Sequence, residues 1–240
     1  MATFIALDAS TEACSVAVVK DSQCWSLSSN TPQYHAQQLL PFIDQLLQQT
    51  GLHIQQLDFI ACTQGPGSFT GLRIGVSVAQ GLAYGAGIPM VGVSSLAALA
   101  KATAKAMQQP MGSVVTLLDA RMGEIYWAVY QDVQNIPVVV RQPTLSKPQD
   151  LVAEIRERHL LESAGLVLAG SGQSMLDFSA EELTGIVVND QLRPHAEAVA
   201  DLAAVLWEQG AVVAADAFEL IYLRNSVSWN KRQRIRTPKT

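Results

Sequence analysis

The chain has few charged and few aromatic side chains for its length. Of its 240 residues, 15% are charged, 6% are aromatic and 49% are hydrophobic, and the formal net charge is −5. Disordered chains are poor in apolar residues and rich in net charge, so this composition excludes a largely disordered protein. The length favours one or two folded domains.

Long hydrophobic runs are also missing. Gly, Gln, Ser or Lys interrupts each apolar stretch before it reaches the roughly 20 apolar residues that cross a bilayer. The first residues contain no positively charged cluster, and Asp8 interrupts the first apolar run, which argues against a secretory signal peptide. We therefore expect a cytoplasmic protein without a membrane segment.

Cysteine is scarce, and histidine lacks the spacing of a metal site. Cys14, Cys24 and Cys62 form no CxxC pair, so neither a disulfide framework nor a zinc site is predicted. The four histidines form neither HxxxH nor HExxH, the spacings that place two ligands on one helical face. We expect three buried free thiols and no metal.

Positive charge is concentrated at the carboxyl end. The rest of the chain has 11 basic and 21 acidic residues, a net charge of −10, and is a poor platform for nucleic acid phosphates. We expect a solvated terminus, with contact to RNA or to an acidic partner as the alternative. The last ten residues contain no acidic side chain and five basic ones: Lys231, Arg232, Arg234, Arg236 and Lys239.

The hydrophobic pattern predicts two consecutive α/β units. The first has strands at 3–8, 15–20 and 24–29, then helix 35–49, strand 58–63, helix 71–85, strand 90–93 and helix 94–107. The second has strands at 113–118, 124–131 and 138–141, then helix 148–159, strand 166–169 and helix 195–209. This order indicates mixed sheets with helices. We predict an amino-terminal lobe at 1–110, a smaller lobe at 111–215, and a returning segment with the basic tail at 216–240.

Two loops at strand ends are candidate phosphate-binding segments. In the first, Asp8 ends a strand and precedes Ser10 and Thr11; the carboxylate can hold hydrated Mg²⁺, and the turn can bind phosphate oxygens. A purely structural turn is the alternative. The second loop is glycine-rich, follows a strand and opens a helix, so it presents free N–H groups to an anion. Its candidate residues are Gly65, Gly67, Ser68, Thr70 and Arg73.

The glycine-rich loop matches none of the common nucleotide or nucleophile motifs. It has neither the Walker A spacing nor GxGxxG, and Ser68 does not lie in GxSxG. In the helix that follows, Gly71, Gly75 and Ala79 repeat at four-residue spacing, as do Gly81 and Gly85. Small residues at this spacing allow close packing, either on the helix's own sheet or against another subunit.

A third segment lies between two predicted strands of the second unit. Asp119 can pair with Arg121, and Gly123 can supply the turn. A structural role is at least as well supported by the sequence as contact with a ligand.

Four segments together carry a family resemblance: DAST at 8–11, GPGSFTGLRIG at 65–75, DARMGEIY at 119–126 and YLRN at 222–225. With these motifs in this order, the chain resembles the bacterial TsaB (YeaZ) family over essentially its whole length. The resemblance implies a two-lobed actin/Hsp70-like (ASKHA) fold, each lobe an RNase H-like mixed sheet with helices and the second lobe reduced. It also implies a role in forming threonylcarbamoyladenosine (t6A) at adenosine 37 of tRNAs that read ANN codons.

The resemblance further implies a protein without catalytic residues of its own. The sister protein TsaD transfers the threonylcarbamoyl group and carries an HxxxH metal pair, whereas the matching stretch 94–100 here is SSLAALA, without a metal ligand. We expect a non-catalytic partner of TsaD with no cofactor of its own. The segment at Asp8 and the loop at 65–75 then form inherited architecture or a vestigial site that binds nucleotide with Mg²⁺ weakly.

Family likeness also predicts the partners. TsaD is expected as the heterodimer partner, the ATPase TsaE as a further component, and tRNA as an indirect one; a homodimer is expected when TsaD is missing. The contact face is expected on the helices at 35–49 and 71–85. The residues predicted to form it are Leu39, Phe42, Leu46, Gly71, Gly75, Val78, Ala79 and Leu82.

Three enzyme classes remain as alternatives. An active nucleotide-dependent phosphotransferase of the sugar-kinase branch needs a second phosphate loop, for which Asp119 and Gly123 are the only candidates. A two-metal nuclease would combine Asp8 with Asp58, Asp119 or Glu124. However, Asp58 begins its strand and Asp8 ends its own, so parallel strands would place the two carboxylates at opposite edges. A peptidase lacks a recognisable Ser-His-Asp arrangement.

Overall fold

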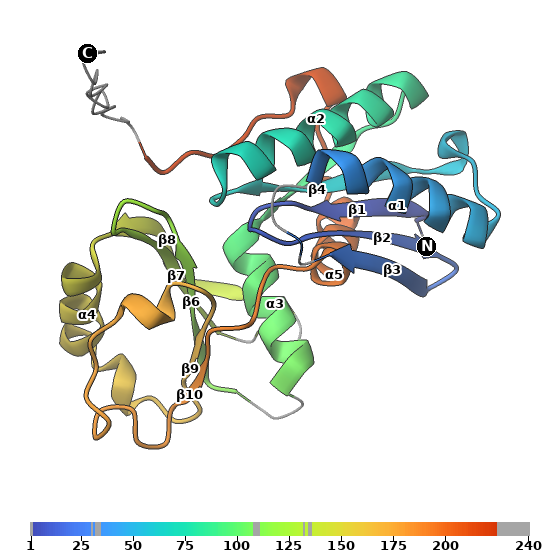
Figure 1. Ribbon diagram of the computed structural model, residues 1–240. Helices are drawn as coiled ribbons and strands as arrows, with labels where there is room; N and C mark the ends of the chain where they lie inside the picture. Colours follow the sequence, from blue (N-terminus) through green and yellow to red (C-terminus); the bar gives the residue numbers. More distant parts are fainter. Residues whose placement is uncertain are drawn as a thin grey trace, which may run out of the picture.

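The structure is a computed structural model that describes residues 2–29, 31, 35–107, 111–131, 133 and 136–224. The predicted basic tail and Asn225 of the YLRN motif lie outside these residues. Two α/β lobes stand side by side (Figure 1). No helix in the described ranges is long and apolar enough to span a membrane.

The first lobe contains a five-stranded mixed sheet with the order β3-β2-β1-β4-β5. Strands β1 (Phe4–Asp8), β2 (Cys14–Lys20) and β3 (Gln23–Ser29) form the predicted antiparallel meander. Strands β4 (Phe59–Gly65) and β5 (Met90–Ser94) run parallel to β1. Helices α1 (His35–Thr50) and α2 (Phe69–Ala86) cover one face of this sheet (Figure 1).

The second lobe repeats this arrangement. Strands β6 (Ser113–Asp119), β7 (Ile125–Gln131), β8 (Val138–Ser146), β9 (Val167–Ala169) and β10 (Val187–Asn189) have the order β10-β9-β6-β7-β8. Read from β8 to β10, this order matches the first sheet from β3 to β5, so the two lobes are duplicates. Helix α4 (Pro148–Glu157) corresponds to α1, but only the short 3₁₀ turn Gln173–Met175 lies between β9 and β10. The second lobe is therefore reduced, as predicted.

The last helix of each unit packs on the sheet of the other unit. Helix α5 (Ala196–Glu208) covers the second face of the first sheet, where Ala196, Val199 and Ala203 join the core around Phe4 and Phe59. Helix α3 (Ser95–Met107) contributes Leu96, Leu99 and Ala100 to the core of the second lobe. Helix α5 falls within the predicted second lobe, 111–215, but packs on the first sheet, because its small apolar face complements that sheet.

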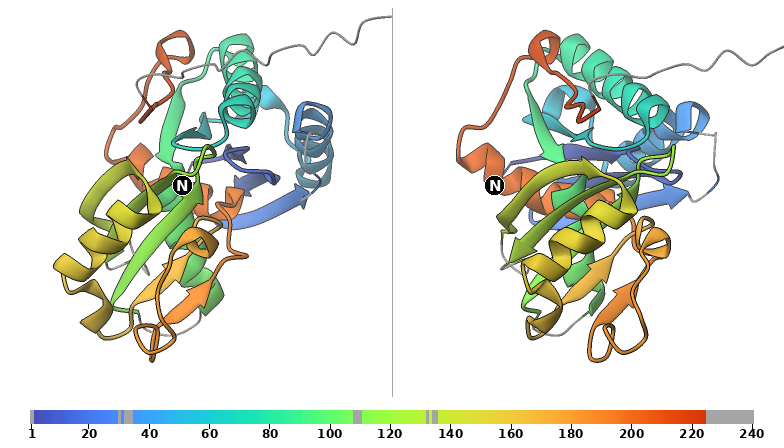
Figure 2. Two further views of the ribbon diagram at one scale, coloured as in Figure 1. Left: turned by 60° about the vertical axis from the view of Figure 1, so that its left-hand side comes forward. Right: turned by 90° about the vertical axis from the view of Figure 1, so that its left-hand side faces the viewer.

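The segment after α5 runs back along the first lobe. Val213 bridges Met90, and the Ile221 N–H donates to the Gln64 carbonyl at 2.8 Å. Both views of Figure 2 show the returning segment beside α2. It thus closes the edge of the first sheet at β5.

Three local features differ from the sequence expectations. Strand β10 was not predicted from the hydrophobic pattern. Cys24 is exposed on the edge strand β3, whereas Cys14 and Cys62 are the buried free thiols that we expected. Strand β8 continues to Ser146, whereas the pattern predicted that it ends at residue 141.

Candidate functional site

The carboxylate of Asp8 lies at the carboxyl end of β1 and is completely buried. Its Oδ1 atom accepts hydrogen bonds from the Ser10 hydroxyl at 2.7 Å and from the Ser10 N–H at 3.2 Å. Among the described residues, its Oδ2 atom has no hydrogen-bond partner. Burial raises the pKa of Asp8, although the hydrogen bonds from Ser10 and the charge of His195 oppose this effect. Burial thus favours the uncharged acid.

Two further buried hydroxyls lack partners near the same edge of the first sheet. Thr63 lies in β4, next to β1, and Ser95 begins α3 directly after β5. The Oγ1 atom of Thr63 and the Oγ atom of Ser95 have no hydrogen-bond partner. Neither residue belongs to the segments that the sequence predicts as sites. Their position at the ends of parallel strands, where Asp8 also lies, is the signal that could have found them.

The glycine-rich loop packs directly on the turn that follows Asp8. The Ser68 N–H donates to the Ser10 carbonyl at 2.7 Å. A Cβ atom at Gly67 would overlap the Ser10 carbonyl oxygen, and one at Gly71 would overlap the Ala9 carbonyl oxygen. Ser68 caps α2, because its Oγ accepts the Gly71 N–H at 3.3 Å. The glycines therefore permit contact between two segments of the same chain.

These residues do not fit a nucleotide bound with Mg²⁺ in this conformation. The structure does bring the turn after Asp8 against the glycine-rich loop, where Ser10 contacts Gly67 and Ser68. However, Asp8, Ser10 and Thr11 are buried, and the Ser10 carbonyl occupies the space in front of the loop. Cation and phosphate ligands need access to the carboxylate and to the free N–H groups. The other two predicted residues, Thr70 and Arg73, lie on the exposed side of α2.

Arg73 belongs to an exposed aromatic cluster. Its guanidinium carbon lies 3.8 Å from the centre of the Phe69 ring, and its Nε donates to the Tyr222 hydroxyl at 3.2 Å. The Phe69 and Tyr222 rings lie 5.8 Å apart. Helix α2 and the returning segment therefore meet at the amino end of α2.

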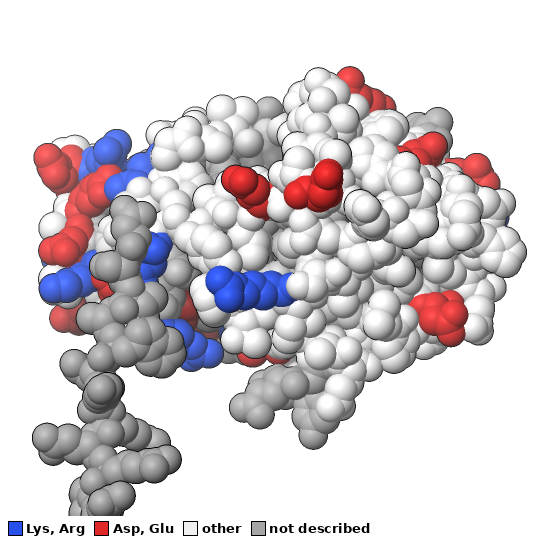
Figure 3. All heavy atoms as spheres, turned by 90° about the horizontal axis from the view of Figure 1, so that it is seen from above, with Lys and Arg blue, Asp and Glu red and all other residues white. Residues whose placement is uncertain are grey.

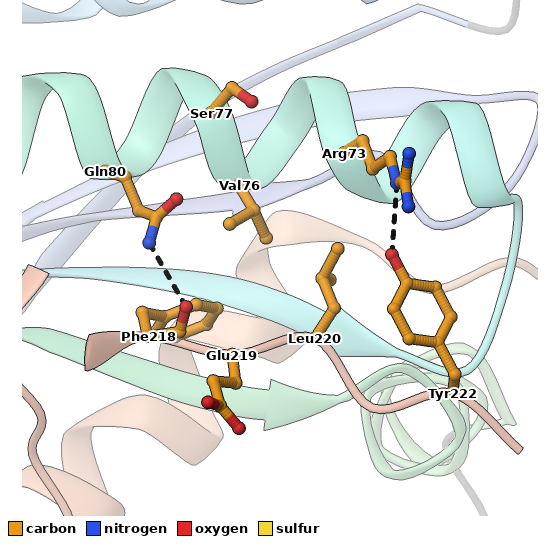
Figure 4. Close-up of a pocket in the computed structure, with 8 residues that line it drawn as sticks. All are labelled: Arg73, Val76, Ser77, Gln80, Phe218, Glu219, Leu220 and Tyr222. Carbon is orange, nitrogen blue, oxygen red and sulfur yellow. Dashed lines mark hydrogen bonds between the residues drawn. The ribbon is translucent and has the colours of Figure 1, made fainter. Parts of the chain in front are cut away.

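A groove of about 400 Å³ continues from this cluster along α2. Its apolar residues are Val76, Phe218 and Leu220. Figure 4 shows the Gln80 side chain reaching across to the returning segment, where its Nε2 donates to the Phe218 carbonyl at 3.1 Å. The groove is thus bounded by one helix and one extended segment that are linked by side-chain hydrogen bonds.

The third predicted segment is a turn that the returning segment holds in place. As predicted, Arg121 pairs with Asp119, with Nη1 and Oδ2 3.0 Å apart. Gly123 has a positive φ of 75°, and so have Arg121 and Met122, at 62° and 56°. Arg224 forms an ion pair with Glu124 and donates to the Ala120 carbonyl at 3.3 Å. The segment that starts on the first lobe therefore ends on the second.

The predicted partner residues separate into two groups. Phe42, Val78 and Leu82 are partly exposed and pack at the margin of the first-lobe core. The other residues lie on the sides of α1 and α2 that face the sheet, where they are buried in this conformation: Leu39, Leu46, Gly71, Gly75 and Ala79. The small or apolar side chains of this second group pack on the chain's own sheet, and their place in a partner contact stays a prediction.

The outer surface of α1 and α2 carries almost no charge. Asp44 is the only Lys, Arg, Asp or Glu residue of α1, and Arg73 is the only one of α2. Leu40 and Tyr84 are exposed on these helices, to 49% and 74%. Figure 3 looks down on this side of the molecule and shows wide uncharged areas between single charged side chains, whereas basic and acidic side chains are crowded together only at the left. We call this surface, formed by the outward residues of α1 and α2, the α1–α2 face.

The acidic residues do not come together as a metal centre. Asp58 accepts the Thr3 N–H at 2.6 Å at the start of β4, the opposite edge of the sheet from Asp8, as predicted. Across the described ranges, no three His, Cys, Asp or Glu side chains form a group that could hold a metal ion.

The two duplicated lobes and the turns at their strand ends define an actin/Hsp70-like protein of the ASKHA class. A family model described as TsaD, tRNA N6-adenosine threonylcarbamoyltransferase, matches residues 29–219. The chain is 37% identical to the tRNA threonylcarbamoyladenosine biosynthesis protein TsaB of Escherichia coli over 231 residues, which are 95% of this chain and 96% of that relative. For the TsaB protein of Haemophilus influenzae, the identity is 35% over 232 residues, with the same coverage.

Solved structures agree with these sequence matches. The structure of YeaZ from Pseudomonas aeruginosa superposes with a TM-score of 0.79 at 33% identity, and the match covers 93% of this chain and all of that chain. The chain belongs to the TsaB (YeaZ) family of proteins, which take part in t6A biosynthesis in tRNA.

Proposed function

We propose that this chain is a non-catalytic partner of the transferase TsaD in the formation of t6A at adenosine 37 of tRNAs that read ANN codons. In this proposal, TsaD carries out the chemical step in the cytoplasm, and the present chain supplies a folded surface that TsaD requires. The ATPase TsaE joins the pair, and tRNA meets the chain only through the complex.

The environment of α3 is the observation that supports a non-catalytic role. By family resemblance, TsaD binds its catalytic metal with two histidines in the corresponding helix. Here Leu96, Leu99 and Ala100 are fully buried and form part of the apolar core that joins the two lobes. None of these side chains can ligate a metal ion.

We also propose that the chain uses no nucleotide of its own. The buried Asp8 carboxylate and the closed glycine-rich loop support this proposal. Isothermal titration with ATP and Mg²⁺ tests it, and we expect no micromolar binding and no turnover. Binding with turnover would instead support an active phosphotransferase.

The α1–α2 face is the surface that we propose for pairing with TsaD, and with a second copy of the chain when TsaD is absent. Its lack of charge and its exposed Leu40 and Tyr84 suit an apolar helix-to-helix contact. Single changes of Leu40 or Tyr84 to glutamate should weaken pairing at least tenfold, because each buries a carboxylate without a partner. Size exclusion and calorimetry with purified TsaD measure this effect.

A matched control is available on the second lobe. Val140 on β8 is exposed to 48%, almost as much as Leu40, but lies away from the α1–α2 face. The change of Val140 to glutamate should leave pairing unaltered. Equal pairing of all three variants would reject the proposed surface.

Reconstitution tests the function itself. TsaD, TsaE, the threonylcarbamoyl-AMP synthase, this chain and unmodified tRNA are combined with ATP, threonine and bicarbonate, and each protein is omitted in turn. Mass spectrometry of the digested tRNA then measures t6A. We expect no product from this chain alone and a loss of product when it is omitted. Product formed by this chain alone, or an undiminished yield without it, would refute the proposal.

A further inference from the structure

Arg73 differs from the other arginines that the structure describes. Six of the seven form an ion pair with a carboxylate within the chain, whereas Arg73 has no carboxylate partner. The six paired arginines are Arg121, Arg141, Arg156, Arg158, Arg193 and Arg224. Among the arginines that the structure describes, Arg73 is therefore the one whose positive charge is not neutralised by a carboxylate of the described residues.

The Arg73 side chain is nevertheless held in a defined position. Its guanidinium lies over the Phe69 ring, and among the described residues only its Nε is used in a hydrogen bond, to the Tyr222 hydroxyl. Figure 4 shows the guanidinium at the end of the groove beside α2, with its two Nη atoms free of the drawn hydrogen bond. A fixed guanidinium loses less conformational entropy when it binds a carboxylate through two N–H groups.

The surroundings of Arg73 do not supply the missing negative charge. Glu219 lines the same groove, but Figure 4 shows its carboxylate directed away from Arg73. The nearby groove residues Val76, Leu220 and Tyr222 present mainly apolar surface. A protein segment that binds in this groove therefore contacts one positive charge next to an apolar surface.

We propose that Arg73 anchors the partner protein by binding one of its carboxylate side chains at the rim of the α1–α2 face. This inference rests on the proposed function, because it assigns the occupant of the face to TsaD. A protein carboxylate fits better than nucleic acid, since a polyphosphate backbone needs several cations and Arg73 is the only Lys or Arg of α1 and α2. One ion pair on an uncharged surface also fixes the register in which the helices meet.

Calorimetry with purified TsaD at low and high salt tests this inference. Arg73→Gln removes the charge and keeps much of the side-chain length, so we expect roughly tenfold weaker binding and a smaller salt dependence. Arg73→Lys keeps the charge but loses the planar fork, so an intermediate affinity is expected. Arg156→Gln is the matched control on the second lobe, where Arg156 pairs with Glu182, and it should bind like wild type.

The possible outcomes separate this inference from the proposed function. If the wild-type chain does not bind TsaD, the proposed function fails. If it binds TsaD and Arg73→Gln, shown by circular dichroism to be folded, binds within twofold of wild type, only the carboxylate anchor fails. If the variant binds TsaD normally but the variant complex retains less tRNA in filter binding, the anion is a phosphate, and the inference is also wrong.

Discussion

Replacing Asp8 with asparagine should change the way in which stability depends on pH. The Asp8 carboxyl is fully buried, its Oδ2 has no partner, and burial raises its pKa. Asparagine has nearly the same shape as the uncharged acid. Its oxygen can accept the two Ser10 hydrogen bonds, and its NH₂ can replace Oδ2 beside the Thr63 hydroxyl. The substitution therefore imitates the protonated form and removes its titration.

The direction of the effect follows from proton binding. Between the pKa of the unfolded carboxyl, about 3.9, and the higher pKa of the folded one, the folded state holds more protons than the unfolded state. The stability that Asp8 contributes is thus fully present below the unfolded pKa and is lost as pH rises through the folded pKa. Within this window the loss approaches about 1.4 kcal/mol per pH unit. For a chain of this size, that loss lowers the melting temperature by roughly 3–6 °C.

Urea unfolding, followed by tryptophan fluorescence from pH 4 to pH 8, measures the effect, since Trp127 is fully buried. The difference in unfolding free energy between Asp8→Asn and wild type should move in favour of the variant as pH rises. His195, whose charge favours ionised Asp8, is present in both proteins. Asp44→Asn, at an exposed position of α1, makes the same change in net charge and serves as the control.

A constant difference across this pH range would refute the reasoning, because it would mean that Asp8 has the same charge in the folded and unfolded states. A variant that loses stability relative to wild type as pH rises would also refute it, since that result requires an ionised carboxylate that the fold stabilises.

Two further predictions concern packing and accessibility. Gly67→Ala should lower the unfolding free energy by about 2–4 kcal/mol, because its Cβ would overlap the Ser10 carbonyl oxygen. Gly81→Ala should instead raise the unfolding free energy by about 0.5–1 kcal/mol, since no atom lies near the added Cβ and alanine favours a helix. Thermal unfolding of both variants measures these changes. Equal effects of the two substitutions would contradict the close contact between Gly67 and Ser10. Cys24 should react faster than Cys14 and Cys62 with a thiol reagent at pH 8, because only Cys24 is exposed. Burial raises the pKa of all three thiols, that of Cys14 to about 11. Rapid release of more than one thiol equivalent from the folded protein would show that Cys14 and Cys62 are not protected.

The sequence was sufficient where a feature depends on neighbours in the chain. The alternation in β1 to β3 and the helical spacing in α1 and α2 located these elements to within a few residues. The Asp119–Arg121 pair was also predicted, because both residues belong to one short turn. The exposed side of helix α2 was harder to predict, since the spacing of Gly71, Gly75 and Ala79 is equally suited to a buried surface and to a subunit contact.

Tertiary structure decided which of these surfaces faces the solvent. Gly75 lies near the Ala9 Cβ and the Cys62 Sγ, so the small residues of α2 belong to the core of the first lobe. The uncharged surface of the same helix instead carries Tyr84. Helical spacing identifies the residues that share a face but does not say against which element that face packs.

The sequence by itself determined most of the elements, their order, the loops at the strand ends and the family to which these motifs point. Only the tertiary structure decided that α3 and α5 exchange sheets and that, within the part of the chain that the structure describes, Asp8 and Thr63 each keep an unpaired buried oxygen and Arg73 has no carboxylate partner. The physical reason is the distance along the chain between the residues that interact. Local patterns follow from the repeat of a helix or strand, whereas burial and pairing arise from residues far apart in the chain that meet only after folding.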